Sequence, residues 1–230
     1  MAVRRALDAD ALTSLAPVAT AVERAAQAIR DSIFEGHVAP GTPLPEATLS
    51  ARLRVSRTTV REALRLLMGE NLLTYEPHKG AAVRMLRPGD VADIYASRRL
   101  LELSAIRRLR SARLAPGAFA AVLAECDAAA AAGDARALGT GDLRFHAEIV
   151  ALHGSPRLDD FFRRLMTEVR LGFLALDKPE TFHGTYHHRN RRLAAILHAG
   201  ELDDARDYLA EYLTQSAEEV RTAVAAKTPA

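Results

Sequence analysis

An aspartate and a histidine stand four residues apart in the stretch GDLRFHAEIV, residues 141–150. In a helix this spacing places the Asp142 carboxylate and the His146 imidazole on one face, one turn apart. Such a pair can supply two ligands of a metal site, an acid/base pair, or an ordinary polar stripe. Which of these three roles applies depends on the side chains that the rest of the chain places beside Asp142 and His146.

Residues 51–65, ARLRVSRTTVREALR, are strongly basic, with five arginines and one glutamate, although the net charge of the whole chain is only +2. From Arg57 to about Met68 the spacing predicts a helix whose apolar face is made of Val60, Ala63, Leu64 and Leu67. Its polar face carries Arg57, Thr58, Arg61 and Arg65. Guanidinium groups one turn apart can bind phosphates or guanine in a major groove, and threonine hydroxyls can join them. An isolated arginine stripe is more often a solvated surface, so the surrounding elements decide.

The elements around this basic helix follow a recognisable order. Apolar residues recur at helical spacing from Thr20 to Phe34, and the prolines and glycine of HVAPGTPLP then mark a turn region. A short helix and the RVS turn come next, and Ser56 can cap the basic helix. Two short β-like runs, LLTYEP and AAVRML, flank HKG and predict a hairpin. This order is that of a winged helix-turn-helix, whose recognition helix enters the major groove of DNA.

The second half of the chain has a helical pattern almost throughout. Asp90 in the RPGD hinge can cap the first of about six helices. The expected breaks between them are Pro116, Gly133, Gly139–Gly141, Gly154–Pro156 and Pro179–Gly184. The fold class is therefore mainly α, an N-terminal winged helix-turn-helix with a small β-hairpin wing followed by a C-terminal all-α antiparallel bundle. The expected parts are a flexible leader, a winged domain and a bundle, over residues 1–19, 20–86 and 90–226.

The composition excludes several classes of protein. Apolar residues make up 49% of the 230 residues, too many for a disordered chain. No stretch approaches the length of an apolar membrane span, and Asp8 and Asp10 interrupt any signal-peptide core. The single cysteine, Cys126, lies on an apolar helical stripe, where a buried structural thiol is expected. One cysteine also suits a reducing cytosol, so we expect a cytoplasmic protein.

The stretch LPEATLSARLRVSRTTVREALRLLMGENLLTYEPHKGAAV resembles the winged-helix domain of GntR-type bacterial transcription regulators, over roughly residues 20–84. The resemblance implies a groove-facing helix and a wing tip at which glycine lets the backbone approach DNA. With Arg65 added from the same helix face, the implied DNA-binding residues are Arg57, Thr58, Thr59, Arg61, Arg65, His78, Lys79 and Gly80. Two departures stand out. Ala47 and Thr48 stand where the family often has an arginine, and Arg54 replaces the glycine usual in the turn.

The rest of the chain resembles the C-terminal ligand-binding domain, called FCD, of FadR-type members of this family. DVADIYASRRLLE resembles its entry helix, DLRFH its inner motif and RRLAAILHAGELDDARDYLAEYL its last two helices, in the expected order. The resemblance implies an antiparallel helical bundle that mediates dimerisation and binds small carboxylate metabolites. In many members a divalent metal, held by one aspartate and three histidines, lies at the pocket floor. Arg98 stands where the family places a pocket arginine, which can fork onto a carboxylate.

Only two of the four metal ligands match. Asp142 and His146 fit the first two, whereas Asn190 and Tyr212, 22 residues apart, stand where the other two histidines are expected. An amide oxygen and a neutral phenol bind Zn or Ni weakly. Three interpretations remain open: an altered Zn or Ni site on Asp142 and His146, a metal-free pocket, or a pair that orients a buried helix.

We favour the metal-free pocket, because polar groups that converge inside an apolar bundle must satisfy one another or a ligand. The expected effector-binding residues are Arg98, Asp142, His146, Asn190 and Tyr212. No catalytic residue is expected.

Several neighbouring residues have competing interpretations. His187 or His188, about one turn before Asn190, could help an altered metal site. Arg98 could instead form a surface pair with Glu102, four residues further on. The other histidines of the bundle without partner spacing are expected at the surface or as satisfied polar residues: His153, His183 and His198.

These features predict a DNA-binding transcription regulator, a repressor rather than an activator. It is expected to bind a pseudo-palindromic operator as a homodimer and to respond to a small organic acid in the bundle. One alternative is a metal-dependent enzyme on a helical bundle that uses Asp142 and His146. The absence of HExxH and of a second carboxylate–histidine pair argues against it. Another alternative is a DNA-binding protein without an effector.

Overall fold

The computed structural model describes residues 19–109, 114–115 and 117–227, so the expected leader, residues 1–19, lies outside these ranges except for Ala19. The first part is three helices and a hairpin: α1 (Ala21–Phe34), α2 (Glu46–Leu53), α3 (Arg57–Gly69), β1 (Leu73–Glu76) and β2 (Gly80–Val83). Six helices follow within the described ranges: α4 (Pro88–Arg108), α5 (Ala120–Ala131), α6 (Ala135–Ala151), α7 (Pro156–Phe173), α8 (Pro179–Ala199) and α9 (Leu202–Lys227). The expected mainly α fold and the six helices of the second half are confirmed.

Side-chain caps set the starts of the first helices. The Thr20 hydroxyl accepts a hydrogen bond from the Glu23 backbone, and the Glu23 carboxylate accepts one from the Thr20 backbone, which together satisfy two free N–H groups of α1. The Ser56 hydroxyl accepts from the Thr59 backbone at 3.0 Å, so Ser56 caps α3 as expected. After α3 the two strands pair antiparallel, with Leu73 opposite Val83 at the base of the wing.

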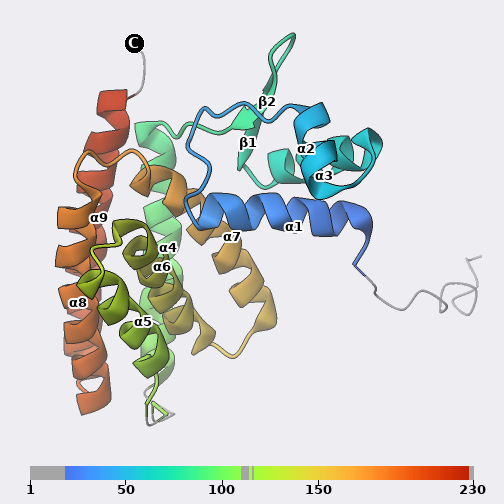
Figure 1. The fold of residues 1–230 in the computed structure, drawn as a ribbon. Coiled ribbons are helices and arrows are strands. Elements are labelled where there is room, and N and C mark those ends of the chain that lie inside the picture. Colours follow the sequence, from blue (N-terminus) through green and yellow to red (C-terminus); the bar gives the residue numbers. More distant parts are fainter. Residues whose placement is uncertain (1–18, 110–113, 116, 228–230) are drawn as a thin grey trace, which may run out of the picture.

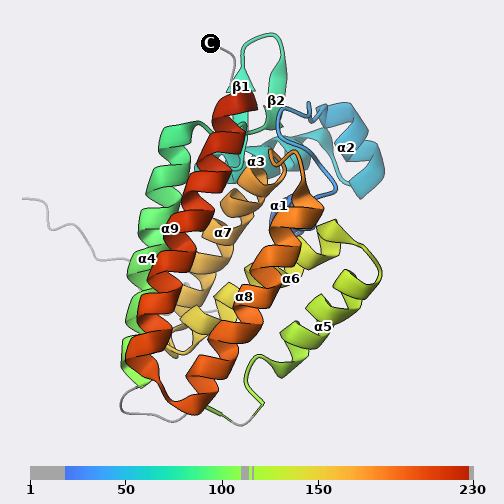
Figure 2. The ribbon, with the colours of Figure 1, turned by 90° about the vertical axis from the view of Figure 1, so that its left-hand side faces the viewer.

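The helical bundle is built around α6. Helix α4 lies beside α9, and α8 lies next to α9 on the other side (Figure 2). Helix α6 contacts α4, α5, α7 and α8, so side chains on most of its circumference point into protein. This placement encloses Asp142 and His146, which are 4% and 0% exposed.

One expected break in the bundle is wrong, and another is right only at its start. Gly139–Gly141 lies inside α6, because helix packing outweighs the weak helix propensity of glycine. In Pro179–Gly184, Pro179 does begin α8, whereas Gly184 lies inside that helix. At Gly139 the packing is close: a Cβ there would lie 2.7 Å from both Arg170 Nη1 and His183 Nε2. Glycine therefore continues the helix here and leaves room for two buried side chains.

The two parts of the chain meet along the C-terminal end of α1. Figure 1 shows α1 lying across α7, and α1 packs on α7 directly. Arg170 donates from Nε to the Phe34 carbonyl at 2.6 Å, and Arg144 pairs with Glu35 at 3.0 Å. At the hinge, Asp90 accepts from the Arg87 backbone at 2.8 Å, so the expected cap of α4 is confirmed.

The expected burial of the single cysteine agrees with the structure. Cys126 is 1% exposed, and burial raises the pKa of its thiol to about 12. Within the described ranges, no helix combines the length and apolar character needed to cross a membrane.

Candidate functional site

Helix α3 presents the predicted basic face. Its apolar side, Val60, Ala63, Leu64 and Leu67, is buried as the spacing predicted. The side chains of the opposite face that are exposed to solvent are Arg57, Thr58, Arg61 and Arg65. Thr59 is half-buried, because its hydroxyl lies 2.9 Å from Ser56 Oγ at the start of the helix. Four of the five α3 residues predicted to bind DNA therefore face outward, and the fifth is engaged in the helix cap.

Arg61 is already paired in the absence of DNA. Its Nε and Nη2 donate to the two carboxylate oxygens of Glu46 on α2, at 3.0 and 2.8 Å. The hydrogen bond from Arg61 holds the pKa of the Glu46 carboxyl below its usual value. In the described part of the chain, Arg57 and Arg65 form no ion pair, so their guanidinium groups are available to a phosphate or a base.

The wing carries the other predicted DNA contacts. His78 and Lys79 are exposed at its tip, and Gly80 has a φ of +85°, a conformation in which glycine is favoured. Lys79 pairs with Glu76 at 2.7 Å, with both side chains largely exposed. A groove of about 750 Å³ separates the wing from α2 and α3, and Glu46, Arg61, Arg65 and Lys79 border it.

Arg54 occupies the turn where the family resemblance implies a glycine. It adopts φ 54° and ψ 44°, the left-handed conformation that usually favours glycine, and it ends α2. Its exposed side chain adds a positive charge to the helix-turn-helix. Ala47 and Thr48, the other departures, are exposed on α2.

The five predicted effector-binding residues converge in the middle of the bundle. Arg98 comes from α4, Asp142 and His146 from α6, Asn190 from α8 and Tyr212 from α9, and each is at most 4% exposed. With Glu102 they form one hydrogen-bonded group, which we call the polar core: Arg98, Glu102, Asp142, His146, Asn190 and Tyr212.

One half of the polar core centres on Asp142. Its Oδ1 accepts a hydrogen bond from Asn190 Nδ2 at 2.7 Å and one from the Tyr212 hydroxyl at 3.0 Å. Burial, followed by the Asp142 charge, raises the pKa of Tyr212 well above its usual value, so the phenol keeps its proton. Asp142 is therefore bound by two neutral donors from α8 and α9.

The other half centres on Glu102. Its Oε2 lies 2.6 Å from His146 Nδ1, and its Oε1 accepts from Arg98 Nε at 2.9 Å. Burial alone raises the pKa of Glu102, but the charges of His146 and Arg98 outweigh it and hold the pKa below its usual value. Glu102 is thus a buried carboxylate between two cationic or hydrogen-donating groups.

The hydrogen-bond pattern also indicates how His146 is protonated. Tyr212 gives its only hydrogen to Asp142, so the 2.9 Å contact of its oxygen with His146 Nε2 requires a hydrogen on that nitrogen. The Glu102 carboxylate requires another on Nδ1. An imidazolium satisfies both, and its charge with that of Arg98 balances the two carboxylates of the polar core.

Glu102 is the residue of this group that the sequence reasoning missed as part of the site. The alternative expectation was an Arg98–Glu102 pair at the surface; the pair exists, but both side chains are 0% exposed. Four-residue spacing puts them on one helix face, so a pocket role for Arg98 already implied that Glu102 lies inside. The burial arises because this face of α4 packs against α6 and α9.

The donor set does not fit the divalent metal that the family resemblance implies. Asp142 Oδ1 already accepts two hydrogen bonds, and both nitrogens of His146 are engaged. His187 lies elsewhere, bonded to Asp127 at 2.8 Å, and His188 is exposed. No group of three or more histidine, cysteine, aspartate or glutamate residues within the described ranges could hold a metal ion.

Two atoms of the polar core have no hydrogen-bond partner. They are Arg98 Nη2, a donor, and Asn190 Oδ1, an acceptor, and both are buried. A groove of about 560 Å³ between α8 and α9 reaches Tyr212, and Arg189 and Arg192 also border it. The polar core therefore offers one donor and one acceptor, beside a tyrosine that borders a surface groove.

Another buried group lies between the polar core and α1. His183, expected at the surface or as a satisfied polar residue, is 2% exposed with Nδ1 unbonded, and burial lowers its pKa to about 4. Beside it, Arg170 is 1% exposed and donates from Nη2 to the Arg136 carbonyl and the Thr140 hydroxyl of α6. Arg170 also binds the Phe34 carbonyl at the end of α1. Burial lowers the pKa of the Arg170 guanidinium to about 10. The periodicity of α8 and α7 places both side chains inward, a signal that the sequence reasoning did not use.

Comparisons with known proteins agree with this architecture. Residues 21–83 match the family described as bacterial regulatory proteins, gntR family, and residues 93–215 match the FCD domain. A GntR transcriptional regulator from Rhodococcus sp. RHA1, of known crystal structure, is 33% identical with a TM-score of 0.82, over 86% of this chain and 96% of that one. McbR/YncC from E. coli has the same fold. It is 23% identical, with a TM-score of 0.76, over 89% of this chain and 99% of that one.

Curated relatives match over less than half of this chain. The Nta operon transcriptional regulator of Aminobacter aminovorans is 44% identical over 71 residues, 31% of this chain and 34% of its own length. The gluconate operon transcriptional repressor of Bacillus subtilis is 41% identical over 86 residues, 37% and 35% of the two chains. The chain thus matches about a third of the length of these relatives. These proteins are regulators rather than enzymes, and the chain belongs to the GntR family of transcription regulators, with a GntR-type winged helix-turn-helix followed by an FCD domain.

Proposed function

We propose that this protein is a repressor that binds a pseudo-palindromic operator as a homodimer and changes its DNA affinity when a small organic acid enters the polar core. The observation that carries the effector part is the buried, unpartnered pair of Arg98 Nη2 and Asn190 Oδ1. Two relatives are named as repressors, that of the gluconate operon and RspR of Escherichia coli, which favours repression.

In this proposal α3 contacts the bases and phosphates of the operator, and the wing contacts the neighbouring DNA backbone. Arg57 and Arg65 lie on the exposed face without ion pairs in the described structure, so they can bind phosphate or guanine at once. His78 and Lys79 at the wing tip reach the neighbouring backbone or minor groove. A two-fold dimer brings two such units to matching half-sites.

The effector is proposed to be a carboxylate that also carries a hydrogen-bond donor. Its carboxylate would accept from Arg98 Nη2, and its hydroxyl or amide would donate to Asn190 Oδ1. The groove between α8 and α9 supplies the way in, because Tyr212 borders both this groove and the polar core. No metal is needed for this binding mode.

Binding in the polar core can be transmitted to α1 through α6. The helix that carries Asp142 and His146 also offers the Arg136 carbonyl and the Thr140 hydroxyl to Arg170, which holds the Phe34 carbonyl of α1. A ligand that binds one arrangement of α6 more tightly therefore shifts the position of α1 and the spacing of the two recognition helices.

The experiment starts from operator DNA selected out of a random duplex pool by the purified protein. Binding of that duplex is measured by fluorescence anisotropy with and without a panel of hydroxy acids and dicarboxylic acids. At least one acid should change the affinity of wild type, and Arg98→Gln should bind the same DNA without responding. Failure of the whole panel, or an unchanged response in Arg98→Gln, would refute the effector assignment.

The DNA assignment is tested separately with the same selected duplex. Arg57→Ala and Arg61→Ala should each weaken binding about ten-fold, since a phosphate or base contact of this kind contributes roughly 1–3 kcal/mol. Arg206→Ala, at a partly exposed position on α9, is the matched control and should bind DNA as wild type does. Normal DNA affinity in both α3 variants would contradict the assignment.

A further inference from the structure

The basic stretch YHHRNRR, residues 186–192 of α8, carries three arginines and two histidines. Arg191 pairs with Asp127 of α5, donating from Nη1 at 2.7 Å to one carboxylate oxygen. Arg189 and Arg192 instead border the groove between α8 and α9. Because these two arginines lie on the wall of a groove, they can bind a ligand and not only solvent.

Matching faces of α8 and α9 form this groove, which we call the α8–α9 groove. Each helix contributes four residues at positions i, i+3, i+4 and i+7, which lie on one helix face. They include His188, Arg189 and Arg192 of α8, and Tyr208, Glu211 and Gln215 of α9. Figure 2 shows the two helices side by side. The volume of the groove, about 560 Å³, falls in the range of about 300–1,000 Å³ typical of small-molecule sites.

The guanidinium groups of Arg189 and Arg192 are positioned but not neutralised. The Arg189 Cζ lies 5.0 Å from the centre of the Tyr186 ring. The Arg192 Cζ lies 5.0 Å from the centre of the Tyr208 ring. Neither arginine forms a hydrogen bond or an ion pair with another residue in the described parts of the chain. Stacking covers one face of a guanidinium group and leaves its N–H edge free, so both arginines can donate to an anion.

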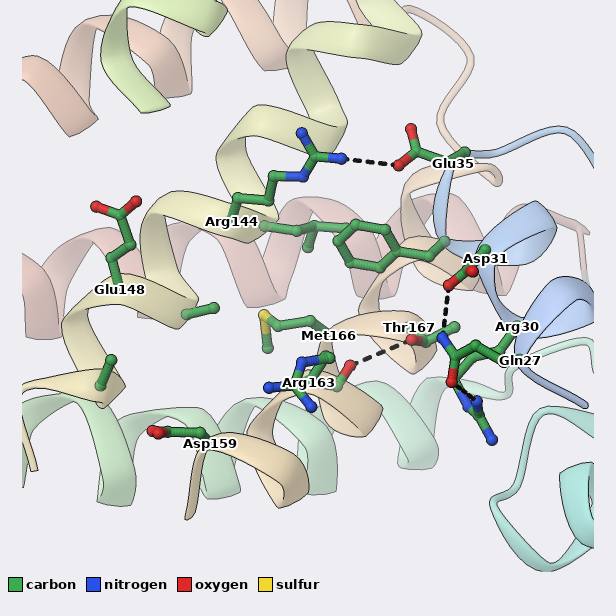
Figure 3. Close-up of a pocket in the computed structure, with 14 residues that line it drawn as sticks. Gln27, Arg30, Asp31, Glu35, Arg144, Glu148, Asp159, Arg163, Met166 and Thr167 are labelled. Atoms are coloured by element: carbon green, nitrogen blue, oxygen red, sulfur yellow. Dashed lines mark hydrogen bonds and ion pairs between the residues drawn. The ribbon is translucent and has the colours of Figure 1, made fainter. Parts of the chain in front are cut away.

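The arginines around a larger cavity behave differently. That cavity, of about 720 Å³, is lined by residues of α1, α6 and α7. Each of the three arginines at its border is already paired with a carboxylate. Figure 3 shows one of these pairs, in which Arg144 Nη2 lies 3.0 Å from Glu35 Oε1. An anion there would have to compete with a carboxylate, whereas the arginines of the α8–α9 groove have no such partner.

The charge of the α8–α9 groove favours an anion. Among the described residues that border it, Glu211 is the only acid. Glu211 Oε1 accepts a hydrogen bond from Gln215 Nε2 at 2.8 Å, so its partner is an uncharged amide and not an arginine. The two arginine charges therefore exceed the single carboxylate charge even when His188 is neutral. A neutral occupant would leave this excess unbalanced, whereas an anion offsets it.

From this arrangement we infer that the α8–α9 groove binds the phosphate group of a small phosphorylated molecule. Arg189 and Arg192 are three residues apart on one helix face, so the three terminal oxygens of a phosphate ester can accept from both guanidinium groups. A single carboxylate has only two oxygens, which one arginine can occupy. The exposed imidazole of His188, on the same face, can supply another donor. The half-buried ring of Tyr208 offers apolar surface to the organic part of the ligand.

This site lies apart from the DNA-binding surface and from the polar core. Figure 1 shows α8 and α9 on the side of the bundle away from α3, so operator contacts through α3 do not involve the groove. Of the polar core, Tyr212 alone borders the groove. Phosphate binding here requires neither an effector in the polar core nor a change in DNA affinity, and it therefore goes beyond the proposed function.

The test uses phenyl phosphate as the probe and isothermal titration calorimetry on the full-length protein. This probe has no carboxylate, so it does not match the effector proposed for the polar core. Wild type should bind it at least about three-fold more tightly than inorganic phosphate, because the phenyl ring buries apolar surface on Tyr208. The double variant Arg189→Gln/Arg192→Gln should bind it at least about ten-fold more weakly, since one charge-assisted hydrogen bond is worth roughly that factor.

Two further variants control for net charge and for misfolding. Arg163→Gln/Arg164→Gln removes the same charge from exposed positions of α7 that do not border the groove, and it should bind phenyl phosphate as wild type does. Glu211→Gln removes the acid from the groove and should bind at least about two-fold more tightly, a gain that misfolding cannot produce. No binding by wild type, an equal loss in the two double variants, or the absence of a gain in Glu211→Gln would each overturn the inference. So would unchanged affinity in Arg189→Gln/Arg192→Gln, or inorganic phosphate that binds as tightly as phenyl phosphate.

Discussion

Arg61 of α3 and Glu46 of α2 form a two-pronged ion pair, with Nε and Nη2 at 3.0 and 2.8 Å from the two carboxylate oxygens. This is the same pair of N–H groups that an arginine offers to guanine or phosphate. Arg61 cannot satisfy both partners in this geometry. If Arg61 contacts the operator as proposed, DNA binding must compete with Glu46.

Removal of the Glu46 charge should therefore strengthen DNA binding. We expect Glu46→Gln to bind the operator about three- to ten-fold more tightly at low salt, since Arg61 is released and a negative charge leaves the interface. Fluorescence anisotropy at two salt concentrations measures this change. In an Arg61→Ala background most of the gain should disappear; an equal gain in both backgrounds would mean that the ion pair plays no part.

Loss of the Glu102 charge should destabilise the bundle. In Glu102→Gln the positive charges of Arg98 and His146 remain buried without their carboxylate, which typically costs about 3–5 kcal/mol. Urea unfolding followed by circular dichroism measures the difference from wild type. Glu211→Gln, an exposed change on α9, should alter stability by no more than about 0.5 kcal/mol. Similar stability of the two variants would argue against the buried charge balance.

The buried His183 should make stability depend on pH. Its pKa in the folded protein is lowered to about 4 from an ordinary value of 6.5, so between these values the unfolded chain binds a proton that the folded protein does not. Stability from this group is fully present above pH 6.5 and is lost as the pH falls toward 4. Between pH 7 and pH 5 the loss is about 2 kcal/mol.

The comparison for this prediction is His183→Asn, measured by urea unfolding at several pH values between 7 and 5. The difference in stability between wild type and variant should shrink as the pH falls, because only wild type has this histidine to protonate on unfolding. Parallel curves for the two proteins would show that His183 is not the group responsible.

The close packing at Gly139 can be tested against a second helical glycine. Gly139→Ala introduces a Cβ 2.7 Å from Arg170 Nη1 and His183 Nε2, so we expect a loss of about 1–3 kcal/mol from overpacking. Gly184→Ala, in α8, meets no heavy atom within 4 Å and should be neutral or stabilising by up to about 1 kcal/mol. Thermal unfolding separates the two, and equal effects would contradict the packing argument.

Much of the arrangement could be predicted from the sequence. Apolar spacing gave the buried face of α3 correctly, and Ser56 was recognised as its cap, because both depend on contacts within a few residues. The convergence of Asp142, His146, Asn190 and Tyr212 followed from family register, since the register fixes which helix faces meet.

What could not be predicted depends on contacts between distant helices. Gly139–Gly141 looked like a break because glycine is a poor helix former, and only the positions of Arg170 and His183 show why it lies inside α6. The cavity of about 720 Å³ lined by residues of α1, α6 and α7 likewise depends on how these helices, distant in the sequence, pack together. No local pattern around Glu148 or Asp159 signals that it is there.

The contact between Arg170 and the Phe34 carbonyl has a consequence for how the chain unfolds. A helix ends with carbonyls that lack partners within the helix, and for α1 one of these is bound by a side chain 136 residues further along the chain. A fragment that stops at the end of the wing would lose this cap and leave the end of α1 to fray. The winged helix and the bundle should therefore melt in a single cooperative transition rather than as two separate domains.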